Sequence, residues 1–210
     1  MPELDDGIEG NPTGSVDLGE GYVLLCKRDK WPWLPTGEEA RVIAGFMIGQ
    51  GQLLQRFKRW ARLRLLNGQV ARSLWQEKLK LSSQFTYDGQ EQFGEVQYFA
   101  RLAMGANDGD ADEACYFEDV ALVRLYSLPD QSLSKLLSHT LVSSTFSDEF
   151  IVAQIKSIKS IVGMIQHRLT CPSGAVEDRF FLMEKPGLDI SQLGIPYSVY
   201  QEEEQDGETE

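Results

Sequence analysis

Alternating apolar and polar residues along much of the chain predict a protein built mainly from β-strands. Within residues 93–104, apolar side chains occupy every second position from Val96 to Leu102, which is the period of a strand with one buried face. Residues 116–126 form a second run, rich in the β-branched and aromatic residues that strands favour. A Gly- and Asp-rich stretch, 105–114, separates the two runs. We therefore expect them to pair as one long antiparallel hairpin with an acidic tip.

Shorter apolar runs predict additional strands elsewhere in the chain. These runs occupy residues 22–27, 40–47, 141–146, 163–168 and 179–185. Residues 132–138 follow the turn at Pro129-Asp130 and predict a short helix. Residues 31–35 contain two prolines, which cannot donate to the hydrogen-bond ladder of a central strand, so this segment should be irregular.

Residues 151–165 allow two interpretations. Seven Ile and Val residues recur there at helical spacing, which favours an amphipathic helix. All seven are β-branched, and so high a share of β-branched residues favours strands. Periodicity alone leaves both interpretations open.

A hairpin with two chemically different faces is predicted at residues 60–75. Asn67-Gly68 is a strong signal for a two-residue type I′ turn, because both central residues of that turn need positive φ. Such a turn pairs Arg64 with Ala71, Arg62 with Ser73, and Trp60 with Trp75, all on one face. The other face carries the apolar side chains of Ala61, Leu63, Leu65 and Val70.

The face with the arginines is the candidate binding surface. Its predicted ligand-binding residues are Trp60, Arg62, Arg64, Arg72 and Trp75, and the cations Arg56, Lys58 and Arg59 add long-range attraction for an anion. Strict alternation puts Arg72 on the apolar face, from which its side chain has to reach outward. In the competing interpretation the two tryptophans form a buried pair beneath residues 31–35, and the arginines are merely solvated.

The net charge of −12 comes from the two ends of the chain. Residues 1–20 and 201–210 each contain six acidic residues and no Lys or Arg, so residues 21–200 carry 20 acids and 20 bases. We expect two disordered acidic tails around a single β-rich domain at 21–200. Within that domain, residues 56–80 hold eight bases and one acid, a patch that can attract an anionic partner.

The cysteines and the hydropathy of the chain indicate the cellular compartment in which we expect the protein. The three cysteines, Cys26, Cys115 and Cys171, are widely separated and odd in number, which argues against a disulfide scaffold and for a reducing environment. The N-terminus has no apolar stretch of the signal-peptide type, and no apolar run is long enough for a membrane span. We therefore expect an intracellular protein without a membrane partner.

Candidate catalytic and metal-binding groups are scarce. The two histidines, His139 and His167, lie outside any recognisable nucleophile motif. No phosphate-binding glycine loop or metal-ligand cluster is visible in the sequence, so we expect a protein that is not an enzyme and needs no cofactor or metal. Five aromatic residues are candidates for a methyl-lysine cage, with burial in a β core as the competing interpretation. They are Trp31, Trp33, Tyr98, Tyr116 and Tyr126.

Two stretches resemble bromo-adjacent homology (BAH) domains. Val120-Ala-Leu-Val-Arg-Leu-Tyr-Ser-Leu-Pro-Asp130 resembles a strand of that module and the turn after it, with Ser127 and Leu128 where an arginine would be expected. Residues 138–144 and 150–164 resemble the strands that follow. The resemblance implies strand, tight turn and strand at residues 151–165. It also implies a mainly β fold, a partly open β-barrel resembling a BAH domain, with one or two short helices.

Three stretches resemble the C-terminal β-rich region of transposon-derived proteins of basidiomycete fungi, which are similar to Kyakuja-Dileera-Zisupton (KDZ) transposases. They are residues 61–73, 93–99 and 180–189, and the resemblance covers roughly residues 21–195. It implies a fungal, genome-associated protein, and we expect no transposase catalytic core in so short a chain.

These resemblances imply a non-catalytic nuclear interaction module that binds chromatin or a protein partner. Direct nucleic-acid binding through the Arg/Trp hairpin at residues 56–80 is the alternative, because arginine contacts phosphate and tryptophan stacks on bases.

Overall fold

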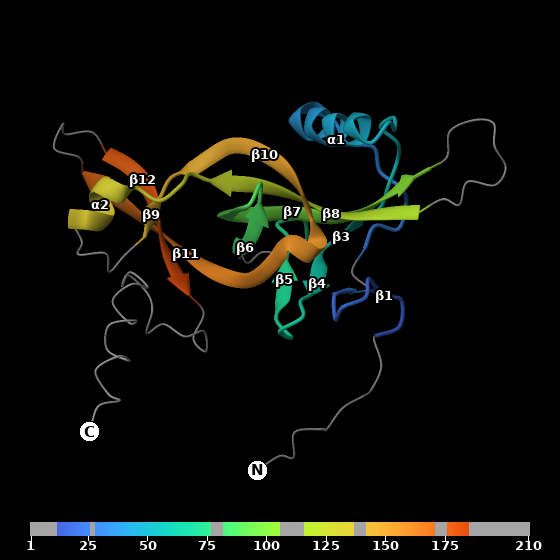
Figure 1. Ribbon diagram of the computed structural model, residues 1–210, viewed down its shortest axis with the longest axis horizontal. Coiled ribbons are helices and arrows are strands. Elements are labelled where there is room, and N and C mark those ends of the chain that lie inside the picture. Colours follow the sequence, from blue (N-terminus) through green and yellow to red (C-terminus); the bar gives the residue numbers. More distant parts are fainter. Residues whose placement is uncertain are drawn as a thin grey trace, which may run out of the picture. The chain divides into compact units, whose positions relative to one another are not determined.

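The computed structural model of this chain describes residues 12–25, 28–76, 82–105, 116–136, 142–170 and 176–184. Within them the protein is mainly β, as the alternation predicts (Figure 1). The strands are β1 (Val16–Asp17), β2 (Val23–Leu24), β3 (Arg59–Trp60), β4 (Arg62–Arg64), β5 (Val70–Arg72), β6 (Ser82–Tyr87), β7 (Gln90–Met104), β8 (Tyr116–Tyr126), β9 (Ser143–Ser144), β10 (Phe146–Gln154), β11 (Ile158–Thr170) and β12 (Val176–Glu184). The helices are α1 (Gly37–Gly49), α2 (Gln131–Leu136) and the 3-10 turn η1 (Ile155–Ser157).

The chain divides into two compact units. The first comprises Met1–Leu125 and Asp148–Ile161, and the second comprises Tyr126–Ser147 and Val162–Glu210. Strands β8, β10 and β11 each continue from one unit into the other.

Strand β1 corrects the boundary expected for the N-terminal tail. It lies inside the segment 1–20, and Val16 pairs with Leu24 of β2. Val16 also packs against the apolar core, and burial of this kind orders a segment despite its acidic composition. The described chain begins at residue 12, and residues 201–210 lie outside the described part.

The β7–β8 hairpin is the central element of the first unit. It runs antiparallel from the Gly94–Leu125 pair to the Met104–Tyr116 pair, which confirms the predicted long hairpin; its tip lies outside the described residues. Strands β10, β8, β7, β6 and β11 are neighbours in that order, and β3 also pairs with β7. A separate sheet has the order β1-β2-β4-β5. Neither order closes into a barrel among the described strands.

A bulge at Gln97 determines which side chains of β7 face which core. The register shifts between Val96 and Tyr98, which pair with Val123 and Leu122 respectively. The extra residue reverses the alternation, so Val96 packs in one apolar cluster and Tyr98 in the other. The prediction that both share a face is therefore wrong.

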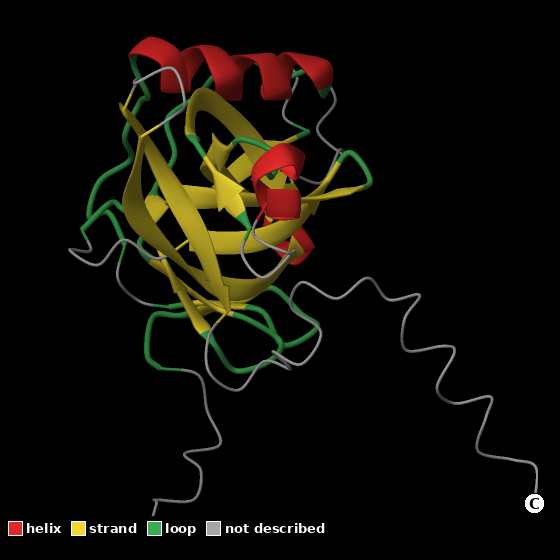
Figure 2. Ribbon diagram, turned by 90° about the vertical axis from the view of Figure 1, so that its left-hand side faces the viewer, coloured by secondary structure: helices red, strands yellow, loops and turns green. Residues whose placement is uncertain are grey.

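Helix α1 covers one face of the β7–β8 hairpin (Figure 1, Figure 2). Ile43 and Met47, one helical turn apart, are buried in the same cluster as Leu102. The strand expected at residues 40–47 is wrong. The two acidic residues in the first turn stabilise the helix, because their negative charge lies at the positive end of the helix dipole. The buried residues Ile43 and Met47 recur at helical spacing and not at the alternating spacing of a strand.

The basic hairpin β4–β5 forms, but its register differs by one residue from the predicted register. Arg62 pairs with Arg72, and the amide of Leu65 donates to the carbonyl of Gln69 at 2.8 Å. The loop therefore has three residues, of which Gly68 alone has positive φ, at 77°. This is the type I turn followed by a left-handed glycine that serves three-residue hairpins.

The shifted register changes the two faces of this hairpin. The predicted pairs Arg64–Ala71, Arg62–Ser73 and Trp60–Trp75 are wrong. Directly opposed residues share a face, so Arg72 and Val70 lie on the same side as Arg62 and Arg64. Leu63, Leu65 and Ala71 are buried on the other side.

A two-residue turn of the kind expected at Asn67-Gly68 occurs at Asp88-Gly89. Both residues have positive φ, 49° and 72°, and Tyr87 pairs with Gln90 across the turn. Strand β6, which this turn joins to β7, is absent from the predicted elements because its Ser and Gln residues weaken the alternation.

Residues 151–165 form strand, 3-10 turn and strand, which is the arrangement that the resemblance implies. Ile151, Ile155 and Ile158 are all buried in one apolar cluster of the first unit, because the turn brings both strands onto the same core. The helical spacing of these residues does not correspond to a helix.

The second unit places β12 between β11 and β9. The rings of Tyr126, Phe146 and Phe180 pack together, with centroids 4.9 to 5.9 Å apart. Helix α2 confirms the short helix predicted at 132–138 as far as residue 136, and residues 137 and 138 lie outside the described part. A carboxylate oxygen of Asp130 accepts a hydrogen bond from the amide of Leu133 at 3.1 Å, which caps the start of this helix.

Candidate functional site

Residues 28–34 of the first unit form an irregular segment, here called the ribbon, which lies beside the residues that lead into β3. The amide of Trp33 donates to the carbonyl of Phe57 at 2.7 Å, and the amide of Phe57 donates back at 3.0 Å. Further along, the amide of Asp29 donates to the carbonyl of Arg59 at 2.9 Å. Trp31 lies between these two anchored points, and the adjacent Pro32 restricts the backbone. The irregular segment predicted at 31–35 is thus confirmed and is held on both sides.

Arg59 is enclosed by aromatic rings and held by one carboxylate. Its guanidinium carbon lies 4.0 Å from the ring centroid of Trp33 and 4.7 Å from that of Trp75. Its Nε donates to Oδ2 of Asp29 at 2.9 Å, and the side chains of Arg59 and Asp29 are only 19% and 15% exposed. A cation paired and stacked in this way stabilises the ribbon.

Two of the five predicted cage aromatics come together around this arginine. Trp33 and Tyr98 meet edge to face, with ring centroids 5.7 Å apart, and Arg59 lies 5.8 Å from the Tyr98 ring. The Tyr98 hydroxyl donates to Glu39 of α1 at 3.2 Å, and burial together with this carboxylate raises the pKa of Tyr98. The space that a methylated lysine would need is occupied by the guanidinium.

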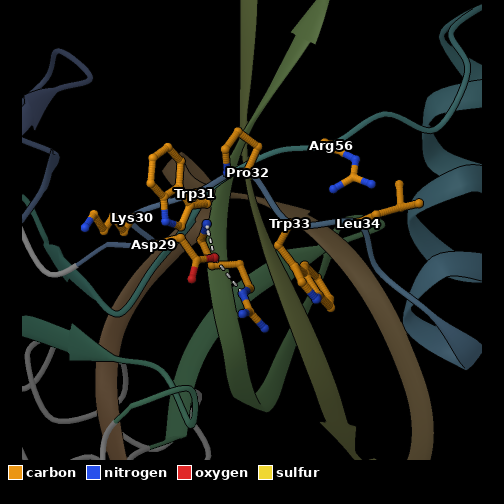
Figure 3. A pocket seen from close by; sticks show the side chains of 8 residues that line it. Asp29, Lys30, Trp31, Pro32, Trp33, Leu34 and Arg56 are labelled. Carbon is orange, nitrogen blue, oxygen red and sulfur yellow. Dashed lines mark hydrogen bonds and ion pairs between the residues drawn. The ribbon is translucent and has the colours of Figure 1, made fainter.

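An open hollow of about 510 Å³ lies along the ribbon (Figure 3). In the view of Figure 3, Trp31 lies toward the left, Arg56 and Leu34 lie toward the right, and Pro32 lies between them. Trp31 is 72% exposed, although its backbone is anchored on both sides. The ammonium group of Lys30 lies 5.5 Å from the Trp31 ring centroid. The hollow thus presents a largely exposed indole beside two cations, Lys30 and Arg56.

A second hollow of about 280 Å³ shares Pro32 and Arg56 with the first. Its wall is completed by Lys58, which directly precedes β3, and by residues from β1, β3, β7 and β8, among them Phe117. Phe117 is 51% exposed. We call the two hollows together the basic groove, defined by Arg28, Lys30, Trp31, Pro32, Arg56, Lys58 and Phe117.

The basic groove carries unbalanced positive charge. Arg59 is held by Asp29, and Arg101 by Asp119, at 2.9 and 2.7 Å. The remaining cations of the lining form no ion pair within the described part of the chain; they are Arg28, Lys30, Arg56 and Lys58. Cations gathered along one concave surface attract an anion more strongly than scattered ones.

Of the predicted site residues Trp60 and Trp75, the first contributes to the lining of the second hollow and the second lines neither hollow. Trp60 is only 5% exposed and lies in the core, and its Nε1 has no hydrogen-bond partner in the structure. A bend at Ala61 separates β3 from β4, so Trp60 is out of phase with Arg62. Trp75 is half-buried and packs beside Arg59. The cross-strand tryptophan pair of the competing interpretation is also wrong.

The predicted cations separate into two groups. Arg56 and Lys58, expected to attract the ligand from a distance, line the basic groove itself. Arg62, Arg64 and Arg72 share a face of the β4–β5 hairpin, outside the lining, and none of the three is without an interaction partner.

Three groove residues, Arg28, Lys30 and Phe117, are absent from the predicted site. The sequence contains a local indication that Arg28 and Lys30 could belong to a surface site. They lie just before a segment of tryptophans and prolines that cannot join a regular sheet. The sequence contains no such indication for Phe117, since its position in the groove depends on the register of β8 against β7.

The second unit contains the one described histidine, His167. Its Nε2 lies 3.4 Å from Oγ of Ser143, and its ring stacks on Phe181 with centroids 3.6 Å apart. Burial, and then the charge of Arg179, lower the pKa of His167. A base that activates a serine is normally oriented by a carboxylate, whereas here the charged neighbour is an arginine. His139 lies outside the described residues.

No group of three or more His, Cys, Asp or Glu residues able to hold a metal ion occurs among the described residues. The helices in the described ranges are too short or too polar to cross a bilayer. No protein family, curated protein or solved structure was found to match this chain.

Proposed function

We propose that this chain is a non-catalytic binding module that holds nucleic acid in the basic groove. The observation that carries the proposal is the presence of four cations without ion-pair partners, within the described residues, beside an indole that is 72% exposed and a phenyl ring that is 51% exposed. Cations contact the phosphate backbone of a nucleic acid, and exposed rings contact its bases. The acidic overall charge does not oppose this role, because the excess of acids lies in the first 20 and last 10 residues.

Nuclear location and a link to fungal transposon-derived proteins belong to this proposal. They rest on the sequence resemblance to BAH domains and KDZ-type proteins. Binding to a chromatin protein is the weaker alternative, because Arg59 already occupies the aromatic cluster of Trp33 and Tyr98 that a methylated lysine would use.

The test is a salt titration of binding to fluorescently labelled DNA, followed by anisotropy. Replacing Arg56 and Lys58 together with Ser removes two groove cations. The slope of log K against log salt should then become shallower by about 0.7 to 0.9 for each phosphate that the variant no longer neutralises. The matched control replaces Arg41 and Lys159, which lie outside the groove and are exposed, with Ser.

The control variant should bind as the unmodified protein does. The proposal fails if the unmodified protein does not bind DNA or RNA at low salt. It also fails if the groove variant and the control variant have equal affinity and equal salt slope.

A further inference from the structure

Trp31 presents an exposed ring in the first hollow of the basic groove. Its indole is 72% exposed, yet the backbone is anchored by the Arg28–Trp60 bridge before it and the Trp33–Phe57 bridge after it. An exposed ring on an anchored backbone can be covered by a ligand with little loss of backbone entropy.

Phe117 provides a second exposed ring on a rigid element. It lies on β8, paired in register with Ala103 of β7. The guanidinium carbon of Arg101 lies 4.7 Å from its ring centroid, and Arg101 is itself fixed by Asp119 at 2.7 Å. The guanidinium of Arg101 therefore packs against the Phe117 ring, which remains 51% exposed.

The two rings belong to different hollows that share Pro32 and Arg56. A ligand that covers both rings spans the two hollows, which Arg56 lines in common, with Lys58 also in the lining of the second hollow. The groove thus offers ring, cation and ring along one surface. A flexible chain with alternating aromatic groups and negative charges matches this order.

Resting on the function proposed above, we infer that the ligand is single-stranded nucleic acid, with unpaired bases stacked on Trp31 and Phe117 and phosphates held by Arg56 and Lys58. A duplex presents phosphates to the cations but keeps the faces of its bases stacked inside, so it gains nothing from the two rings. Base stacking on an aromatic side chain tolerates any sequence, and therefore the module should have little sequence preference.

The experiment compares a single strand of about 16 nucleotides, a length within known site sizes, with the duplex of the same sequence. The unmodified protein should bind the single strand more tightly. Replacing Trp31 or Phe117 with Ala should each weaken single-strand binding roughly 5- to 150-fold, the range measured for stacked bases. Duplex binding should change little. Trp31→Phe, which retains a ring, should recover part of the loss.

Two controls keep the result interpretable. Leu53→Ala removes another exposed apolar side chain, 83% exposed and outside the lining, and should have no effect on binding. Phe117→Leu retains apolar volume on β8 without a ring, and it should weaken binding as Phe117→Ala does. Urea denaturation of each variant verifies that it is folded.

The outcomes separate this inference from the proposed function. Equal or tighter binding to the duplex overturns the inference, as does unchanged single-strand binding by the Trp31 and Phe117 variants. If Arg56→Ser with Lys58→Ser still weakens binding in that case, the groove binds nucleic acid through phosphates alone and the proposed function stands. Absence of binding to either form overturns both.

Discussion

The guanidinium carbon of Arg59 lies 4.0 Å from the ring centroid of Trp33, and Asp29 holds the same guanidinium through Nε at 2.9 Å. The sequence predicts that Arg59 attracts a ligand from a distance, but this arginine forms part of the wall that supports the ribbon of residues 28–34. The ring of Trp33 is engaged by this contact, while that of Trp31, two residues earlier, is left uncovered. Arg59, which stabilises the ribbon, and Trp31, which is a candidate binding residue, are therefore close in the chain but have separate roles.

Replacing Arg59 with Ala should lower the free energy of unfolding by about 2 kcal/mol, because the buried Asp29 carboxylate loses its partner and Trp33 and Trp75 lose a stacked cation. Arg59→Lys keeps the charge but not the planar group, and it should lower this free energy by about 1 kcal/mol. Urea denaturation measures both. Arg41→Ala, at an arginine that is 73% exposed, should change the free energy of unfolding far less than Arg59→Ala does. Equal losses at Arg59 and Arg41 would contradict a structural role for Arg59.

Replacing Arg62 and Arg64 together with Ser distinguishes the hairpin face from the basic groove. These arginines lie outside the groove lining and already have partners. Nucleic-acid affinity should therefore fall less than in the variant with Arg56→Ser and Lys58→Ser, as measured by anisotropy at equal ionic strength. A larger loss of affinity in the Arg62 and Arg64 variant would indicate that nucleic acid binds to the β4–β5 hairpin and not to the basic groove.

Replacing Gly94 with Ala should destabilise the first unit by about 3 kcal/mol. A Cβ at this position of β7 would lie 2.3 Å from Cγ1 of Val123 and 2.9 Å from the carbonyl oxygen of Arg124, so a packed strand has to move. The control is Gly45→Ala in α1, where nothing lies within 4 Å, and stability should rise by up to about 1 kcal/mol. Thermal denaturation measures both, and a neutral Gly94→Ala would show that β7 and β8 are not packed this closely.

Lowering the pH should destabilise the fold through His167. Its pKa in the folded protein is held below the ordinary value of 6.5 by burial and by the charge of Arg179. The unfolded chain therefore takes up this proton first as the pH falls through 6.5, and the His167 contribution to stability is lost between that value and the lower folded pKa. NMR titration of the ring should locate the lowered pKa directly.

Arg179→Gln should raise the pKa of His167 toward its ordinary value, because one of the two causes of the shift is removed. His167→Asn should make stability less dependent on pH in the same window. An unchanged His167 titration in the Arg179 variant would exclude the contribution of that charge and leave burial as the cause.

The elements that the sequence predicts best are those whose signals are local. The long β7–β8 hairpin follows from a period of two and from β-branched and aromatic residues around a Gly- and Asp-rich connection. The short helix after Pro129 follows from turn chemistry, since Asp130 caps it. The predicted register of β4–β5 is wrong because Asn67-Gly68 is compatible with both a two-residue and a three-residue loop. The three-residue loop buries Ala71 opposite Leu63, where the two-residue loop would place Arg72.

The candidate site is predictable only in part. Charge density alone identifies the region that contains Arg56 and Lys58. It cannot distinguish these from Arg59, because the partner that neutralises Arg59 lies 30 residues earlier in the chain. Nor can it place Phe117 on the same surface, since that requires the pairing of β8 with β7.

By itself, then, the sequence determined that this protein is mainly β, that its two ends carry the negative charge, and that cations gather within residues 56–80. Only the tertiary structure decided which of these side chains are exposed. Burial and ion pairing depend on residues far apart in the chain, so Trp60 and Arg59 became structural while Trp31 and Arg56 remained at the surface. Periodicity and composition report what each segment can form, whereas the contacts between segments determine which groups are left to meet a ligand.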